Sequence, residues 1–569
     1  MHMKLTKAKT DKKAKMDDYF DLGGFEFPIT TENEDAQLWF NRGLLWTYGF
    51  NHAEAIACFE RALEADPNCA MAYWGRAYAA GPNYNMPWAL FDDAQRAKAL
   101  KRGHEAAKAG AALAGNVTPW EAGLLRALTK RFPQQDITDI ATMEAWNAEF
   151  ANDMRKVLAR HPDNLDVRTV FVEALMNLTP WQMWDLQSGV PAEGAATLEA
   201  QEALESTMNS MPEAWSHPGL LHLYVHLMEM SPVPERALKA GDVLRRMMPD
   251  AGHLIHMPTH IDVLCGHYQN VVDWNEAAVD ADLKYWRKHG AMNLYTGYRL
   301  HNYHFIIYGA MFLGQIEPAL RAVKGAWDTC PEEMLRIESP PMADYFESYV
   351  SFEPHVLVRF GKWRDAIALP LPEDQKLYAT LTAHVHYARG VGHAALGEVD
   401  AALHEEEKYL AAMERVPAAR VVHNNTVVDL LAVGAEMLRG EILYRQGQYD
   451  KAFAALRRSV ALDDGLLYDE PWGWMQPTRH ALGALLFEQG HIAEAEAVYR
   501  EDLGLGGALS RASIHPDNVW ALKGLHDCLK ARGETVEIVQ VRQRLELAQA
   551  RADAAVAASC FCAQAAMAG

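Results

Sequence analysis

Residues 36–68 read AQLWFNRGLLWTYGFNHAEAIACFERALEADPN, and this stretch decides the fold. Its apolar and small residues recur at helical spacing, as in two helices that pack against each other. The small residues Gly43, Ala55 and Ala62 let the helices approach closely. The large rings of Trp39 and Phe59 fill the space between the helices. Pro67 then stops the second helix. The stretch predicts a pair of antiparallel helices.

The spacing of these residues matches the 34-residue tetratricopeptide consensus, in which each repeat is one helix–turn–helix unit. The pattern returns near the C-terminus, at GEILYRQGQYDKAFAALRRSVALDD (440–464), GALLFEQGHIAEAEAVYREDL (483–503) and HPDNVWALKGLHDCLKARG (515–533). Between residues 100 and 430 the repeats are degenerate and carry extra turns. The predicted fold is therefore all-α: an α-solenoid of tetratricopeptide repeats that is degenerate in its middle.

The chain divides into three predicted parts. Residues 1–19 are a flexible basic tail, residues 20–550 form the solenoid, and residues 551–569 form an Ala-rich tail that contains Cys560 and Cys562. The first sixteen residues have little to bury, so we expect their deletion to leave the melting temperature unchanged.

Composition excludes several classes of protein. The 569 residues carry a net charge of −21, which disfavours binding to nucleic-acid phosphates. No apolar run approaches the length of a membrane span, and the first twenty residues lack the apolar core of a signal peptide. The 7 cysteines are few and scattered, which fits a reducing compartment. We expect a cytoplasmic protein without a nucleic-acid or membrane partner.

The large number of histidines is not explained by the predicted fold. Six of the 24 histidines fall between residues 217 and 260, in the segments HPGLLHLYVHLME (217–229) and AGHLIHMPTHID (251–262). His217 precedes a proline and is expected to cap a helix. Helical spacing places one stripe on each segment, made of His222, His226 and Glu229 in the first and of His253, His256 and His260 in the second. Pro258 predicts that the second helix begins or kinks there.

Two adjacent helices with stripes of imidazole and carboxylate are what a transition-metal site requires. We predict metal ligation by His222, His226, His253, His256 and His260. His301 and His304, in HNYHF (301–305), are expected to complete the ligand set from the next element of the array. His52, Cys560 and Cys562 are further possible ligands, and His423 is expected to lie outside the site. Copper, zinc and iron suit histidine ligands, whereas the lack of a dense carboxylate cluster argues against magnesium and calcium.

Several of these segments together resemble a widespread group of bacterial tetratricopeptide-repeat proteins. The group shares segments of the form GFNHxEAxxxFxxAxxLDPxCAMAxWG, HPGxxHxYIHxxE and HxxHMPSHI, and the resemblance spans residues 36 to about 530. Thr259 stands where the group usually has Ser. The resemblance implies the repeat fold and marks the same histidines and Glu229, but it implies no particular reaction.

Three functions fit these features. The first is a metal-dependent enzyme acting on a small-molecule or peptide substrate, with an oxidoreductase favoured over a hydrolase. In a zinc hydrolase Glu229 would be the catalytic general base. The second is a non-catalytic scaffold that binds a peptide or protein partner on its concave surface. The third is a metal chaperone or sensor, which the 24 methionines and the terminal cysteines would serve.

Overall fold

The computed structural model describes residues 19–563, so the predicted basic tail lies outside the described residues except for Tyr19, as do the last six residues of the chain. The described part is almost entirely helical, and its only strands are the two-residue β1 (Val421–Val422) and β2 (Asn425–Thr426), which pair antiparallel as a short hairpin. The predicted all-α solenoid is confirmed.

Consecutive helices pack side by side along the chain. In the N-terminal half the helices are α2 (Glu34–Tyr48), α3 (His52–Ala65), α4 (Ala70–Ala80), α5 (Asp93–Ala112), α6 (Pro119–Arg131), α7 (Ile140–Arg160), α8 (Leu165–Met176), α9 (Thr197–Ser210), α10 (Pro218–Glu229), α11 (Leu238–Leu244), α12 (Gly252–His256) and α13 (Pro258–Leu264).

In the C-terminal half they are α14 (Tyr268–His289), α15 (Thr296–Leu313), α16 (Ile316–Thr329), α17 (Glu332–Leu335), α18 (Met342–Phe346), α19 (Glu353–Arg359), α20 (Trp363–Ala368), α21 (Ala379–Ala395), α22 (Val399–Met413), α23 (Val427–Arg445), α24 (Tyr449–Asp464), α25 (Thr478–Glu488), α26 (Ile492–Asp502), α27 (Val519–Ala531) and α28 (Glu537–Gln549). Short 3-10 turns are η1 (Trp88–Leu90), η2 (Pro212–Ser216), η3 (Pro234–Ala237), η4 (Glu347–Val350) and η5 (Arg511–Ser513).

The first predicted helix pair is α2 and α3. Its close contact depends on glycine, because a Cβ at Gly43 would lie 2.7 Å from a ring carbon of Phe59. The same ring packs against Gly75 of α4, so Phe59 fills the space between three successive helices. Near the C-terminus Tyr499 of α26 lies in the same way between Gly483 of α25 and Gly524 of α27. The repeat pattern therefore corresponds to one recurring mode of packing.

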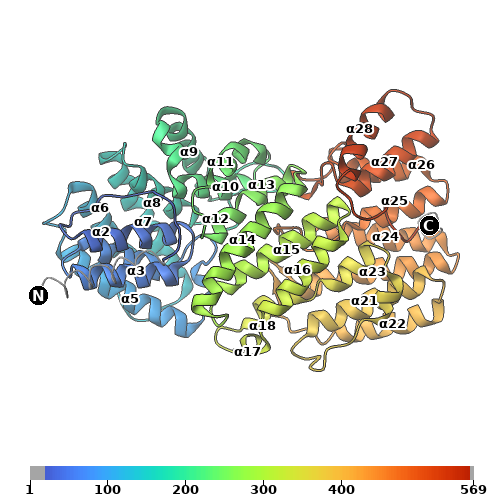
Figure 1. Cartoon of the computed structure of the whole chain (residues 1–569), viewed down its shortest axis with the longest axis horizontal. Coiled ribbons are helices and arrows are strands. Elements are labelled where there is room, and N and C mark those ends of the chain that lie inside the picture. The colour runs from blue at the N-terminus through green and yellow to red at the C-terminus, as the bar shows by residue number, and fades with distance from the viewer. Residues whose placement is uncertain (1–18, 564–569) are drawn as a thin grey trace, which may run out of the picture.

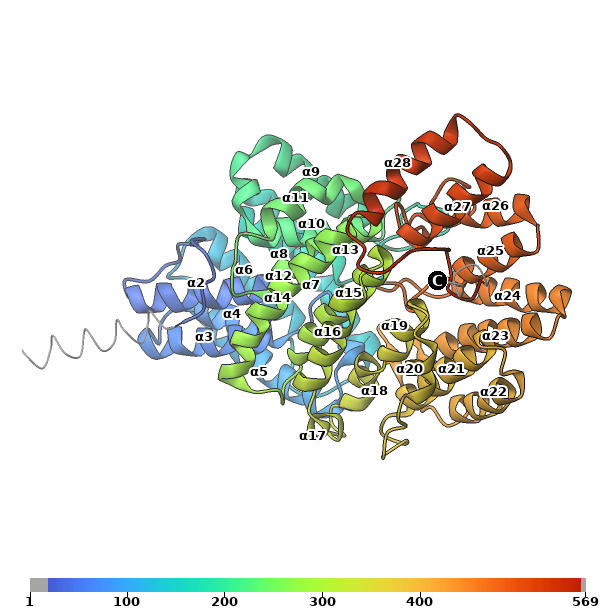
Figure 2. The same cartoon turned by 45° about the vertical axis from the view of Figure 1, so that its right-hand side comes forward.

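Two hydrophobic cores meet in the middle of the molecule. One is built mainly from residues 20–261 and the other mainly from residues 268–562. In Figure 1 the first helices, α2 and α3 (blue), and the last ones, α23 to α27 (orange to red), lie at opposite ends, with α14 and α15 between them, and Figure 2 shows the same order. Every helix within residues 19–563 is too short or too polar to cross a membrane.

The central helices are buried on all sides, which is unusual for a surface repeat. Every residue of α10 is buried, as is every residue of α15 from Arg299 onward. His217 caps α10 and accepts a hydrogen bond from the Leu220 backbone N–H, as predicted. Pro258 is the first residue of α13, so the helix that begins at Gly252 ends and restarts there. This break agrees with the sequence prediction.

Candidate metal centre

The predicted histidines of α10 and α12 come together in a first cluster, made of His222, His226 and His253. Their ligand atoms all lie within 4.8 Å of one another, and all three side chains are buried. Two of them are held by their Nδ1 atoms: His222 Nδ1 lies 2.7 Å from the carbonyl oxygen of Tyr48, and His226 Nδ1 lies 2.9 Å from Glu229 Oε1. Both acceptors require an N–H at Nδ1, so the Nε2 atom of each ring carries a free lone pair.

These lone pairs have no hydrogen-bond donor among residues 19–563. His222 Nε2 and His226 Nε2 are buried without a partner, and so are both nitrogens of His253. An unsatisfied buried polar atom costs about 1–3 kcal/mol, and such atoms in a folded protein call for an explanation. A histidine that ligates a metal usually donates its other N–H to a carbonyl or carboxylate, as His222 and His226 do here. The first cluster is thus arranged like a three-histidine metal site.

Glu229 connects the first cluster to a second one. Its two carboxylate oxygens accept hydrogen bonds from two imidazoles, at 2.9 Å from His226 Nδ1 and 2.5 Å from His260 Nδ1. The carboxylate of Glu470 also lies 2.6 Å from His260 Nδ1. Burial, and then the charge of Glu470, raise the pKa of Glu229 well above its usual value. A nearby cation would offset the cost of burying these two carboxylates.

The second cluster consists of His256, His260 and His301, from α12, α13 and α15. His256 Nδ1 lies 2.6 Å from Asn275 Oδ1, and the amide nitrogen of Asn275 donates to the Val271 carbonyl at 2.7 Å, which fixes Oδ1 as the acceptor. His256 and His260 therefore both carry their proton on Nδ1 when neutral. Their Nε2 atoms face each other at 2.7 Å. Two lone pairs repel at this distance unless a proton or a metal ion lies between them.

The third cluster shares His301 with the second and adds His304 and His423. His301 Nδ1 lies 3.1 Å from His423 Nε2, and the Tyr349 hydroxyl lies 2.9 Å from the same His423 atom. His423 is in the two-residue turn of the β1–β2 hairpin, which brings it to α15 from more than a hundred residues away in the sequence. The three clusters form one continuous group of histidines, all buried except the partly exposed His423.

Burial favours the neutral form of several of these imidazoles, which is the form that binds metal. It lowers the pKa of His222 and of His423 to about 3. Burial, followed by the charges of neighbouring histidines, lowers the pKa of the other affected rings well below the usual value, and these are His226, His253, His256, His301 and His304.

Backbone strain is concentrated around the clusters. Among residues 19–563 the non-glycine residues with positive φ are Phe50 (54°), Trp181 (60°), His423 (48°) and Asp517 (55°). Phe50 packs on all three rings of the first cluster, with ring centroids 4.6 to 5.6 Å apart, and Trp181 lies 5.9 Å from His226. Bulky residues in the left-handed region cost about 1–3 kcal/mol and are found mainly at functional sites.

The structure brings together all seven histidines that the sequence predicts as ligands, each in at least one of the three clusters. The possible ligand His52 lies elsewhere. Its Nε2 is 3.5 Å from Asn83 Nδ2, and burial lowers its pKa to about 4. It is absent from the potential metal-binding groups found among residues 19–563.

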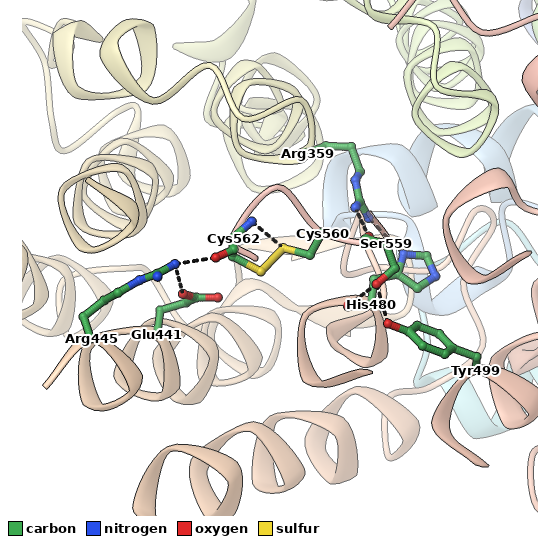
Figure 3. The surroundings of a disulfide bond; sticks show 8 residues. All are labelled: Arg359, Glu441, Arg445, His480, Tyr499, Ser559, Cys560 and Cys562. Carbon is green, nitrogen blue, oxygen red and sulfur yellow. Dashed lines mark hydrogen bonds and ion pairs between the residues drawn. A yellow bond between two sulfur atoms is a disulfide. The ribbon is translucent and has the colours of Figure 1, made fainter. Parts of the chain in front are cut away.

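The terminal cysteines lie against the C-terminal core. Cys560 and Cys562 lie close to Glu441 and form a disulfide, so in this state their sulfur atoms are not thiolate ligands (Figure 3). Arg445 donates to the Cys562 carbonyl, and Arg359 donates to the Ser559 carbonyl at 2.5 Å (Figure 3). The described part of the tail is thus docked on the solenoid, and its cysteines belong to a different group from the histidines.

His423 and Glu470 are members of the site that the sequence did not indicate. His423 was expected outside the site, and its placement beside His301 corrects that expectation. Neither residue lies in a histidine-rich segment, and each reaches the site from a loop, so helical spacing gives no signal for them. The strained backbone of His423 would have been a signal, but it is visible only in the structure.

Comparisons with known proteins agree with the repeat fold. The sequence profile of the tetratricopeptide repeat matches residues 36–69, which correspond to the first helix pair. A search of curated protein sequences finds no matching relative.

Three solved structures align with most of the chain at low similarity. They are the APC/C hetero-tetramer Cut9–Hcn1 (12% identity, 91% of this chain and 78% of that chain, TM-score 0.29), yeast Tom70 (11%, 91% and 89%, TM-score 0.27) and Naa15/Naa10 bound to HypK-THB (10%, 90% and 70%, TM-score 0.20).

Proposed function

We propose that this tetratricopeptide-repeat protein binds transition-metal ions on its buried histidines and acts as a metal-dependent oxidoreductase on a small-molecule or peptide substrate. The observation that carries the proposal is the first cluster. The free Nε2 atoms of His222 and His226 and both nitrogens of His253 lie within one coordination sphere, and the first two rings are oriented through Nδ1.

Three protein ligands favour a catalytic ion over a structural one. Structural zinc sites are closed by four protein ligands, whereas catalytic sites keep one position for water or substrate. Histidine nitrogen suits copper, zinc and iron, and the first cluster contains no carboxylate oxygen that would select magnesium or calcium.

The environment of Glu229 favours oxidation over hydrolysis. Both of its oxygens accept hydrogen bonds from imidazoles, so the carboxylate orients ligands in two clusters and is not free to activate a water molecule. It also links the first and second clusters through His226 and His260.

Elemental analysis of untagged protein, purified from cells supplied with copper, zinc and iron, tests metal binding. We expect wild-type protein and a His480→Ala control to carry the same metal content, and His226→Ala to carry less. Equal metal content in all three proteins would exclude the first cluster as a site.

Oxygen uptake by the copper- or iron-loaded protein with ascorbate as reductant tests the redox activity. We expect His226→Ala and His256→Ala to lose this uptake and His480→Ala to retain it. Metal binding without any uptake above that of free metal would contradict an oxidoreductase and favour a chaperone or sensor.

A further inference from the structure

The third cluster contains a sulfur atom that the histidine pattern does not include. Met475 is fully buried, and its Sδ lies 3.0 Å from His304 Nε2. The other nitrogen of His304 is buried without a hydrogen-bond partner among the described residues. An imidazole nitrogen gains little from a thioether as a hydrogen-bond acceptor. The contact is better explained if both atoms face a common ligand.

Three separate elements bring these residues together. His304 is on α15, His423 is in the β1–β2 turn, and Met475 is in the loop between α24 and α25. The turn and the loop are fastened to each other by Asp469, which accepts hydrogen bonds from the Asn424 backbone N–H at 2.9 Å and from the Asn425 side chain at 2.7 Å. These hydrogen bonds join the turn to the loop and so hold His423 and Met475 next to α15.

The backbone at His423 gives a second, independent observation. Its φ of 48° lies in the left-handed region, and a two-residue hairpin turn favours glycine or asparagine at such a position. Histidine is less stable there, yet its Nε2 points to His301 Nδ1 at 3.1 Å. A strained residue whose side chain reaches a ligand cluster indicates a functional role.

The charge of this ligand set differs from that of the second cluster. Glu229 and Glu470 flank His260, so the second cluster can balance a divalent ion. The residues of the third cluster are neutral imidazoles and a thioether, and Phe352 stacks on His304 with ring centroids 4.4 Å apart. A largely buried, neutral ligand set favours an ion of low charge, and soft thioether sulfur favours copper(I) over harder ions.

We propose that His304, His423 and Met475, with the shared His301, form a separate copper(I) site. This inference rests on the proposed function in that it takes the buried histidines to be metal ligands. It adds two ligands, His423 and Met475, and the oxidation state of the ion. It also assigns the third cluster a different metal preference from the first.

Anaerobic titration with copper(I), in competition with the chelator bathocuproine disulfonate, tests the site in the full-length protein. We expect Met475→Leu and His423→Asn each to weaken copper(I) binding at one position by at least tenfold. Met154→Leu, which alters another fully buried methionine in α7, should leave it unchanged. Asparagine tolerates the left-handed backbone, so metal-free His423→Asn should remain folded although it loses the contact with the Tyr349 hydroxyl, and its melting curve checks this.

X-ray absorption at the copper edge gives a direct readout of the sulfur. We expect a sulfur neighbour of copper at about 2.3 Å in wild-type and Met154→Leu protein, taking the usual metal–thiolate distance for the thioether as well. This sulfur neighbour should be lost in Met475→Leu. Unchanged copper(I) affinity in both Met475→Leu and His423→Asn would overturn the inference. So would a wild-type spectrum without sulfur.

His226→Ala separates this inference from the proposed function. If that variant loses metal from the first cluster but keeps the sulfur-bound copper(I), both proposals stand. If His226→Ala loses metal while the two third-cluster variants bind copper(I) normally, only the copper(I) site fails. If His226→Ala keeps all its metal and Met475→Leu loses copper(I), only the first cluster fails.

Discussion

Asp502 and Glu229 are buried carboxylates that each accept hydrogen bonds from two histidines. The two places differ in the partners of the outer ring nitrogens, which are the nitrogens not bonded to the carboxylate. Asp502 accepts from His480 Nε2 and from His515 Nδ1, both at 2.9 Å. The other nitrogen of His480 accepts a hydrogen bond from Arg359 at 2.9 Å. Around Glu229, the outer nitrogen of His226 has no partner within residues 19–563 and faces two further histidines.

A carboxylate paired with histidines is therefore no evidence for a metal site by itself. At Asp502 the pairing completes a closed hydrogen-bond network that joins α25 and α26 to the segment before α27. At Glu229 the same pairing orients His226 Nε2, which has no partner among the described residues, and His260 Nε2, which faces His256 Nε2 at 2.7 Å. The convergence of free nitrogens distinguishes a metal site from a structural network, and variants at both places test this distinction.

The largest effect is expected for His226→Ala. It removes one of three ligands of the first cluster, and total binding energies of about 10–16 kcal/mol at small histidine and cysteine sites suggest a loss of about 4 kcal/mol per ligand. Affinity at this position should fall about a thousandfold, as measured by competition with a metal chelator. His480→Ala alters the Asp502 network instead. An equal loss of metal affinity in that variant would contradict the distinction between the two places.

His480→Ala should act on stability instead. It leaves Asp502 and Arg359 buried with one partner fewer, and breaking such a network costs about 3 kcal/mol. We expect this loss in the free energy of unfolding of metal-free protein, measured by denaturant titration. His226→Ala should cost less than His480→Ala in the same titration, because the outer nitrogen of His226 is unsatisfied in the metal-free protein.

A third buried carboxylate, Glu173, has no histidine partner and sharpens the comparison through its pH dependence. Burial raises its pKa to about 8, and the Tyr78 hydroxyl contacts it. The folded state therefore binds a proton that the unfolded state releases above about pH 4.5. The contribution of protonated Glu173 to the free energy of unfolding is fully present below about pH 4.5 and is lost as the pH rises towards 8.

Glu173→Gln should remove this loss. The difference in unfolding free energy between the variant and the wild type should grow by about 3 kcal/mol in favour of the variant from pH 5 to pH 8. Parallel denaturant titrations at the two pH values check it, with exposed Glu199 changed to Gln as the control. A pH profile identical to that of wild type would show that Glu173 is ionised in the folded protein.

The smallest effect is expected for Glu229→Gln. The amide keeps the shape of the side chain but loses the charge that orients His226 and His260. Loss of such an outer partner usually weakens metal binding ten- to hundredfold, or by about 1.4–2.7 kcal/mol. Asp502→Asn is the matched control and should leave the metal affinity unchanged, so equal affinities in both variants would remove the distinction drawn above.

The fold could be predicted from sequence because its signals are local. Gly43, Phe59 and Pro67 lie within one repeat, and the packing of Phe59 against Gly43 follows from their spacing. The histidines of α10, α12 and α13 were predictable for the same reason. The division of these residues into separate clusters was not, because it depends on how two cores dock and on where Pro258 interrupts the helix.

Loop contributions lie beyond what periodicity can reveal. His423, Glu470 and Met475 are far from the histidine segments in sequence, and each reaches the site through an irregular segment. The sequence also could not show which imidazole nitrogens are free. That depends on acceptors such as the Tyr48 carbonyl and Asn275, which belong to other helices.

The burial of the clusters at the meeting of two cores has a consequence for how the protein acquires metal. His226, His256 and His304 have no exposed surface, whereas His423 is partly exposed, so under the proposed function an ion would reach the inner clusters only through local opening of the structure. Loading would then be fastest while the chain folds, and later exchange would be slowed by the rate of this opening. The ions present when the chain folds would remain bound long afterwards, so the history of a protein sample would determine its metal content.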